Sequence, residues 1–279
     1  MELEQILARA LAFAEEFDWP GASEFLTDYL EDHSDSPEMH CWLGVVEREM
    51  GREGLSYDHF KQALALQPED PHILATAGNG IAAFDDPDAM EALKNAALMA
   101  PDVPTTRMLY GAYLAREGFH EWALEQLDAA RVLDPEDPQI AYELGVARAL
   151  SGDMDGAADA VADAVQTDPE DGWVRTVFGL LLLSLDREEQ AVGELAEAAR
   201  LSPEDIEAQI LAASAAGANS MDGLAYEMLE RARMRSEEPD LVLVTAVEDA
   251  LDSGPEALTA MLAEDLVPNA LRTRLAQRP

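Results

Sequence analysis

The chain has 279 residues, 48% of them hydrophobic, so it is long enough to bury a sizeable core and is not a disordered acidic tail. Asp and Glu number 57 against 18 Lys and Arg, which gives a formal charge of −39 at pH 7. Phosphates repel a chain this acidic, so the composition argues against nucleic acids and anionic membranes as partners.

The N-terminal residues predict neither a signal peptide nor a membrane span. Glu2 and Glu4 stand where a signal peptide carries positive charge, and charged residues such as Arg9 and Glu15 interrupt the apolar positions that follow. Cys41 is the only cysteine, so the chain can form no internal disulfide and is compatible with a reducing compartment. We therefore expect a cytoplasmic protein.

Most of the chain repeats with a period of 34 residues. An apolar residue followed by glycine recurs at Gly44, Gly78, Gly111, Gly145 and Gly179, in steps of 34, 33, 34 and 34. Alanines keep the same period at Ala89, Ala123, Ala157, Ala191 and Ala225, and again at Ala96, Ala130, Ala164, Ala198 and Ala232. The tripeptide Pro-Glu-Asp begins at Pro68, Pro135, Pro169 and Pro203. Because unrelated residue types share one period, the period indicates a structural repeat.

Each period predicts two helices joined by a short turn. Residues 138–150 carry apolar side chains at helical spacing and end at Ser151-Gly152-Asp153. A second helix then begins at Met154 and ends before Pro169, because proline cannot continue a helix. The recurring Gly and Ala suit a close crossing of the two helices, where a larger side chain would hold the backbones apart.

This pattern resembles the tetratricopeptide repeat (TPR), a helix-turn-helix unit of 34 residues. The units that fit are 37–70, 71–103, 104–137, 138–171, 172–205 and 206–239, of which 71–103 is one residue short and 206–239 has Ala212-Ala213 in place of the bulky residue and Gly. Residues 1–36 are interpreted as a degenerate first repeat or N-terminal helical cap. Residues 240–279 are interpreted as a C-terminal helical cap, with shorter helices around 241–251, 255–262 and 268–277. The resemblance implies an all-α fold, a right-handed superhelical solenoid of these repeats.

No residue pattern predicts catalysis, a cofactor or a metal. The five histidines are His33, His40, His59, His72 and His120, and no two have the spacing that aims both imidazoles at one metal from a single helix. Residues 77–83 resemble a dinucleotide-binding loop but fall inside a predicted helix, without the preceding strand. Residues 153–156 resemble the start of a calcium loop but lack the later Glu, and Cys41 has no histidine at a catalytic spacing. We therefore expect a protein that is not an enzyme.

The resemblance also implies that the first helix of each repeat lines a concave groove. The implied lining residues are Cys41, Val45, Asn79, Met108, Ala112, Arg116, Tyr142, Val146, Trp173, Leu180 and Leu183. Between residues 72 and 184, only Arg116 is charged at these places. One interpretation is a groove for an apolar or amphipathic segment, with Met108, Tyr142 and Trp173 as contacts. The other is that these residues pack first helices together, or that the chain's own C-terminal helices fill the groove.

The predicted function is a non-catalytic scaffold or adaptor that binds a peptide or helix of another protein. A carboxylate clamp of the kind found in Hsp90 adaptors is not expected, because Ala75 stands where a lysine is needed, although Asn79 matches. Two alternatives stay open. One is a dedicated chaperone or assembly factor for a secretion or surface-structure system, and the other is a structural solenoid that associates with itself.

Overall fold

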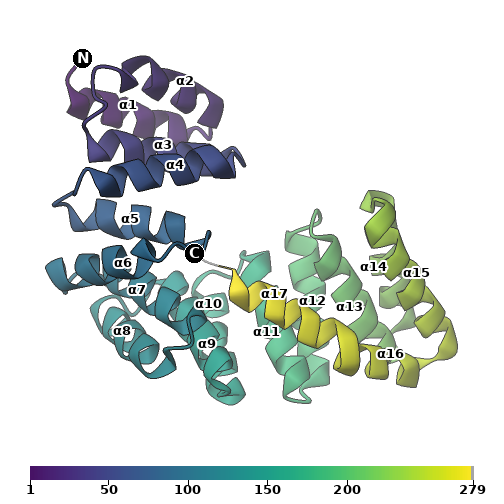
Figure 1. Cartoon of the computed structure of the whole chain (residues 1–279). Coiled ribbons are helices and arrows are strands. Elements are labelled where there is room, and N and C mark those ends of the chain that lie inside the picture. The colour runs from purple at the N-terminus through teal and green to yellow at the C-terminus, as the bar shows by residue number, and fades with distance from the viewer. Residues whose placement is uncertain (278–279) are drawn as a thin grey trace. The chain divides into compact units, whose positions relative to one another are not determined.

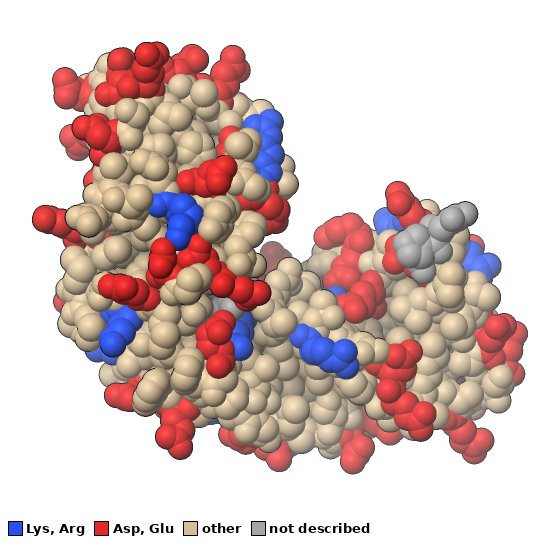
Figure 2. All heavy atoms as spheres, viewed as in Figure 1, with Lys and Arg blue, Asp and Glu red and all other residues tan. Residues whose placement is uncertain are grey.

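A computed structural model describes residues 1–277, apart from the side chains of residues 238 and 239. Every regular element in this range is a helix, and the range contains no strand, which confirms the all-α class (Figure 1). Contacts divide the chain into two compact units, which we describe separately. The first unit holds Met1–Glu117 with Glu121–Leu133, and the second holds Gly118–His120 with Asp134–Gln277. Acidic side chains outnumber basic ones on the visible face of each unit (Figure 2).

The first unit is a stack of helix pairs. Its helices are α1 (Leu3–Glu15), α2 (Trp19–Leu30), α3 (Pro37–Glu49), α4 (Glu53–Ala65), α5 (Pro71–Ala82), α6 (Asp88–Met99), α7 (Pro104–Arg116) and α8 (His120–Leu133). Helix α3 packs on α4 and α5 packs on α6, as expected for helix-turn-helix repeats. The odd-numbered helices α1, α3, α5 and α7 also contact one another in order, so these first helices form one layer.

The second unit continues the pairs and adds a C-terminal segment. Its helices are α9 (Pro138–Ser151), α10 (Met154–Thr167), α11 (Gly172–Ser184), α12 (Glu188–Leu201), α13 (Ile206–Ala218), α14 (Asp222–Arg235), α15 (Glu238–Ser253), α16 (Pro255–Met261), the π-helical η1 (Leu262–Leu266) and α17 (Val267–Ala276). Helices α15 and α16 pack on α13, but α17 turns back and packs on α11. The C-terminal segment therefore does more than cover the end of the last repeat.

Aspartates at the repeat boundaries begin the first helices. Asp70, Asp137, Asp171 and Asp205 each accept a hydrogen bond from a backbone N–H of the helix that follows, at 2.8 to 2.9 Å. An N-cap of this kind stabilises a helix by about 1 kcal/mol. The Pro-Glu-Asp motif thus has a local cause, since the proline follows one helix and the aspartate caps the next.

Close crossings explain the glycines of the period. A Cβ atom built on Gly44 would lie 2.6 Å from the ring of Phe60 on α4. Gly80 receives the other side of the same ring, so Phe60 fits between α3 and α5. The role assigned to the small residues is confirmed. Residues 77–82 belong to α5, so the glycines that resemble a dinucleotide loop serve packing instead.

Candidate functional site

The first helices of the first unit surround an open pocket of about 370 Å³. We call it the first-helix pocket. Its lining residues are Leu7 from α1; Glu38, Cys41, Trp42 and Val45 from α3; and Asp70, His72, Ile73 and Thr76 from the start of α5. Two residues of the predicted groove, Cys41 and Val45, therefore line one cavity. Its base is apolar, and two of its lining residues are acids.

Two carboxylates, those of Glu38 and Asp70, give the pocket its charge. Burial, followed by the charges of Asp70 and Glu38, raises the pKa of the Cys41 thiol to about 12. The thiol is therefore protonated at pH 7 and is a poor nucleophile. Asp70 Oδ1 accepts the His72 N–H at 2.8 Å, and Glu38 Oε2 accepts the Ser36 hydroxyl at 2.7 Å. Neither carboxylate is paired with a cation among the described residues, so the pocket favours a positively charged partner group.

The other predicted groove residues of the first unit are less open. Asn79, Met108 and Ala112 are all buried, with at most 7% of their surface exposed. Arg116 is half-buried, and its Nη1 donates to the carbonyl of Ala112 at 3.1 Å. These four residues contribute to packing within the helix layer, and the cavity lies nearer the N-terminus.

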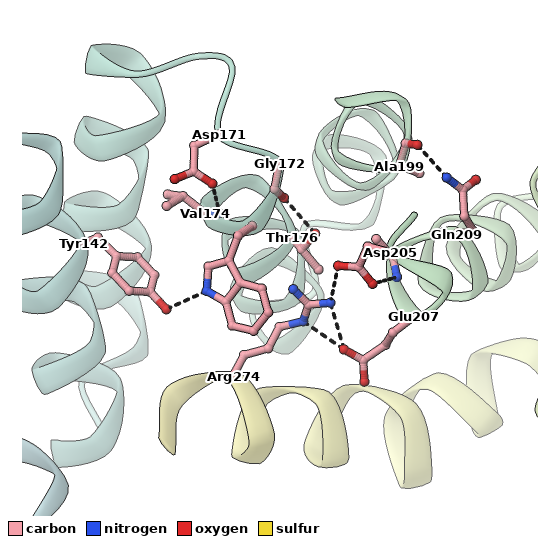
Figure 3. Close-up of polar contacts among 12 residues, drawn as sticks. Tyr142, Asp171, Gly172, Val174, Thr176, Ala199, Asp205, Glu207, Gln209 and Arg274 are labelled. Atoms are coloured by element: carbon pink, nitrogen blue, oxygen red, sulfur yellow. Dashed lines mark hydrogen bonds and ion pairs between the residues drawn. The ribbon is translucent and has the colours of Figure 1, made fainter. Parts of the chain in front are cut away.

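In the second unit, the chain's own α17 occupies the face of α11. Arg274 of α17 is only 1% exposed. Its Nη2 donates to Asp205 at 2.8 Å and also forms an ion pair with Glu207 at 2.8 Å (Figure 3). Its Nε also donates to Glu207, at 2.9 Å. The centre of the guanidinium lies 4.2 Å from the ring centre of Trp173, in a cation–π contact.

The predicted contacts of the second unit are therefore used within the chain. Trp173 Nε1 donates to the Tyr142 hydroxyl at 3.1 Å while Arg274 covers the indole ring. Tyr142, Val146 and Leu180 are buried, so they form core rather than an open surface. Leu183 lines a space of about 430 Å³ beside η1 and α17. Of the two interpretations left open above, the second unit supports the one in which C-terminal helices fill the groove. A direct contact of Tyr142 or Trp173 with a partner does not fit this arrangement.

Sequence reasoning missed the cluster around Arg274. Arg274 and Asp205 are 69 positions apart, and α17 lies outside the repeat, so the period carries no information about their contact. One signal was available, since Arg274 stands at helical spacing from Ala270 and Leu271, directly before Leu275, in a very acidic chain.

A histidine pair was also missed. His40 Nδ1 and His59 Nδ1 lie 3.1 Å apart, although the two residues are on different helices of one repeat. His40 Nε2 is 3.1 Å from the carbonyl of Ser34. Burial, and then the neighbouring His40, lower the pKa of His59. A search for histidines within one helix could not find this pair, because the helix crossing brings it together.

Two further sequence patterns have structural explanations. Asp153, which begins the calcium-like segment, caps α10 by accepting the Gly156 N–H at 3.0 Å. Within residues 1–277, no group of three or more His, Cys, Asp or Glu side chains is arranged to hold a metal ion. Among the described helices, none is long and apolar enough to cross a membrane.

The family model of the tetratricopeptide repeat matches residues 111–172, which run from within α7 to the first residue of α11. The chain contains tetratricopeptide repeats. No curated protein matches its sequence. The likeness to solved structures extends well beyond the matched residues.

Three solved structures illustrate the likeness of this TPR protein. A chain of the APC/C hetero-tetramer Cut9–Hcn1 has a TM-score of 0.68 and 18% identity, over 85% of this chain and 48% of that one. This chain thus spans about half the length of that protein. A tetratricopeptide repeat protein from Parabacteroides merdae has a TM-score of 0.63 and 13% identity, over 88% and 98%. PilF of Pseudomonas aeruginosa has a TM-score of 0.60 and 15% identity, over 76% and 96%. At these identities the likeness establishes the fold alone.

Proposed function

We propose that this TPR protein is a non-catalytic, cytoplasmic scaffold that binds an amphipathic peptide or helix of another protein in the first-helix pocket. The observation that carries the proposal is the pocket itself, because it is open, apolar at its base and lined by unpaired carboxylates. The TPR fold is a protein-interaction fold in general, and fold alone does not define a site. Here Cys41, Val45 and Ile73 line the pocket and form the apolar surface that a partner would cover.

The chemistry of the pocket favours binding over catalysis. Cys41, the thiol that lines it, is held in the protonated form by burial and by two acids. A partner side chain that packs on the apolar base gains about 25 cal/mol of binding free energy for each Å² of apolar surface removed from water. The acids at the edge add orientation and selectivity through charge.

Site-specific photocrosslinking in cells tests the proposal. A photoreactive amino acid replaces Thr76, which lines the pocket, or Lys94, which is exposed on α6 outside it. We expect a crosslinked partner from position 76 that is absent from position 94 and that disappears when Val45→Glu places a charge in the apolar base. Identical crosslinks from both positions, or none from position 76, would contradict the proposal.

The identity of the crosslinked protein separates the kinds of function. Several unrelated partners indicate a scaffold, and a single stoichiometric secreted subunit indicates a dedicated chaperone. A crosslink only to a second copy of this chain indicates a structural solenoid.

A further inference from the structure

We infer that the partner of the first-helix pocket is an amphipathic helix carrying an arginine, bound at Asp70 and Glu38 as Arg274 is bound in the second unit. This inference rests on the proposed function and adds the chemistry of the partner. Its basis is an internal comparison, because the chain already holds one helix on its first-helix layer.

The first point of comparison is the capping aspartate. Asp70 ends the unit 37–70 and Asp205 ends the unit 172–205, so the two have the same place in the repeat. Each uses Oδ1 to cap the next first helix, from His72 N at 2.8 Å and from Ala208 N at 2.9 Å. In the second unit, Oδ2 of Asp205 then accepts Arg274 Nη2 at 2.8 Å. Oδ2 of Asp70 makes no hydrogen bond among the described residues, so the matching acceptor is unused.

The second point is the presence of a second carboxylate. Glu207 lies two residues after Asp205 and completes the pair that holds Arg274. In the first unit, the second carboxylate comes from the preceding first helix, as Glu38 of α3. Glu38 and Asp70 both act on the Cys41 thiol, which places their charges over the same cavity. A guanidinium donates in two directions at once and can therefore contact both acids, which an ammonium does less well.

The third point is an aromatic surface. The indole of Trp173 lies beneath the guanidinium of Arg274 in the second unit. In the first unit, Glu38 stands at the repeat position that Trp173 has in the second unit. Trp42 lies one helical turn further along α3 and lines the same pocket. A half-buried indole beside an acidic edge suits an arginine, whose planar group stacks on rings and is weakly hydrated.

The face of α17 also defines the apolar part of the partner. The buried apolar residues of α17 are Val267, Ala270, Leu271 and Leu275, which lie 7, 4 and 3 positions before Arg274 and 1 position after it. This is one face of a helix. The pocket offers Leu7, Val45 and Ile73 to such a face. The expected partner segment therefore has an arginine with apolar residues at these four offsets.

A peptide with the sequence of residues 262–277 is a direct probe. Labelled with fluorescein, it is titrated into the full-length protein at low salt, and binding is followed by fluorescence anisotropy. We expect binding that weakens at least about tenfold when both acids are neutralised by Glu38→Gln and Asp70→Asn. Asparagine is as good an N-cap as aspartate, so these changes leave the start of α5 intact.

Matched controls locate the peptide and identify the group that binds. Asp58→Asn removes an exposed acid of α4 outside the pocket and should leave the affinity unchanged. In the peptide, glutamine at the position of Arg274 should weaken binding as much as the double variant does, while glutamine at the position of Arg272 should not. Arg272 is exposed and donates to Asn269, its one hydrogen-bond partner among the described residues, which makes it the matched arginine.

Three results would overturn the inference. The first is an affinity that is unaffected by the double variant, or no binding at all. The second is binding that is lost on Asp205→Asn and kept in the double variant, which means that the peptide displaces α17 in the second unit. The third is a wild-type dimer that Asp70→Asn dissolves, because the occupant is then a second copy of this chain. In the first two cases the crosslink from position 76 still tests the proposed function separately.

Discussion

Replacing Arg274 by alanine tests how firmly α17 is held. The guanidinium donates one hydrogen bond to Glu207 and one to Asp205, forms ion pairs with both carboxylates and stacks on Trp173, and the side chain is 1% exposed. We expect Arg274→Ala to loosen α17 without unfolding the helix pairs. Asp205 caps α13 through Oδ1, whereas Arg274 binds its Oδ2, so the cap can persist when the arginine is removed.

The size of the effect follows from these contacts. A hydrogen bond to a charged group contributes about 1.5–3 kcal/mol, and a partly desolvated cation–π contact about 1–2 kcal/mol. The carboxylates keep 21% and 43% of their side-chain exposure, so water recovers part of the loss when the arginine is removed. We therefore expect about 3 kcal/mol for Arg274→Ala. Arg274→Met keeps the packing of the side-chain stem and should cost about 2 kcal/mol.

Hydrogen exchange measures this local stability, because unfolding of a repeat array need not be a single two-state transition. A loss of about 3 kcal/mol speeds exchange of the α17 amides by roughly 100-fold. Trp173 gives a second signal, since it is the one tryptophan of four that lies in the second unit. Arg272→Ala is the control and should change exchange little. Unchanged exchange in Arg274→Ala, or the same increase in both variants, would refute the reasoning.

Three more predictions concern stability. Ala157→Leu should cost about 1–3 kcal/mol in a urea titration, because Ala157 is fully buried where α9 and α10 cross, and a neutral result would show that there is room at the crossing. The lowered pKa of His59 means that the unfolded chain takes up a proton below pH 6.5 before the folded chain does. The contribution of His59 to stability is therefore fully present above pH 6.5 and is lost as the pH falls through the lower folded-state pKa. His59→Gln should make the melting temperature depend less on pH between pH 7 and pH 5, and a dependence equal to that of the wild type would exclude His59 as its source. With a charge of −39, the melting temperature should rise with sodium chloride as the screening length shortens from about 30 Å at 0.01 M to about 3 Å at 1 M. A neutral osmolyte is the control, because it is excluded from the protein surface as salt can be but does not screen charges. A melting temperature that does not change with salt would mean that local ion pairs outweigh the net charge.

The helix pairs could be predicted because their causes are local. Asp171 caps the helix directly after it, and Gly44 faces Phe60 only 16 residues later. Each cause recurs with the period, so several weak signals combine into a strong one. The composition likewise predicts an acidic surface, because Asp and Glu are rarely buried and the chain has 57 of them.

The site could be predicted only in part, because a repeat pattern carries information about contacts within a repeat and between adjacent repeats, but not about more distant contacts. It assigned Cys41 and Val45 to the first helices, where the pocket lies. It also assigned Ala112 and Leu180 to an open groove, although both are fully buried in the helix packing. It does not mark Asp70, because Asp70 lies at the boundary between two repeats, before the first helix begins. Helix rotation and the return of α17 depend on three-dimensional packing, and neither has a periodic signature.

The return of α17 has a consequence for the order in which the chain is made. About 100 residues separate Trp173 from Arg274, so at roughly 5–20 residues per second the ribosome needs about 5–20 s to synthesise the stretch between them. The helix pairs form from contacts with near neighbours and can fold as they emerge. Until Arg274 has been made, the indole of Trp173 has no guanidinium to cover it, and neither has the carboxylate of Asp205 once it has been added, 69 positions before Arg274. A nascent chain therefore exposes an aromatic ring beside an acid, a surface that the finished protein conceals under α17.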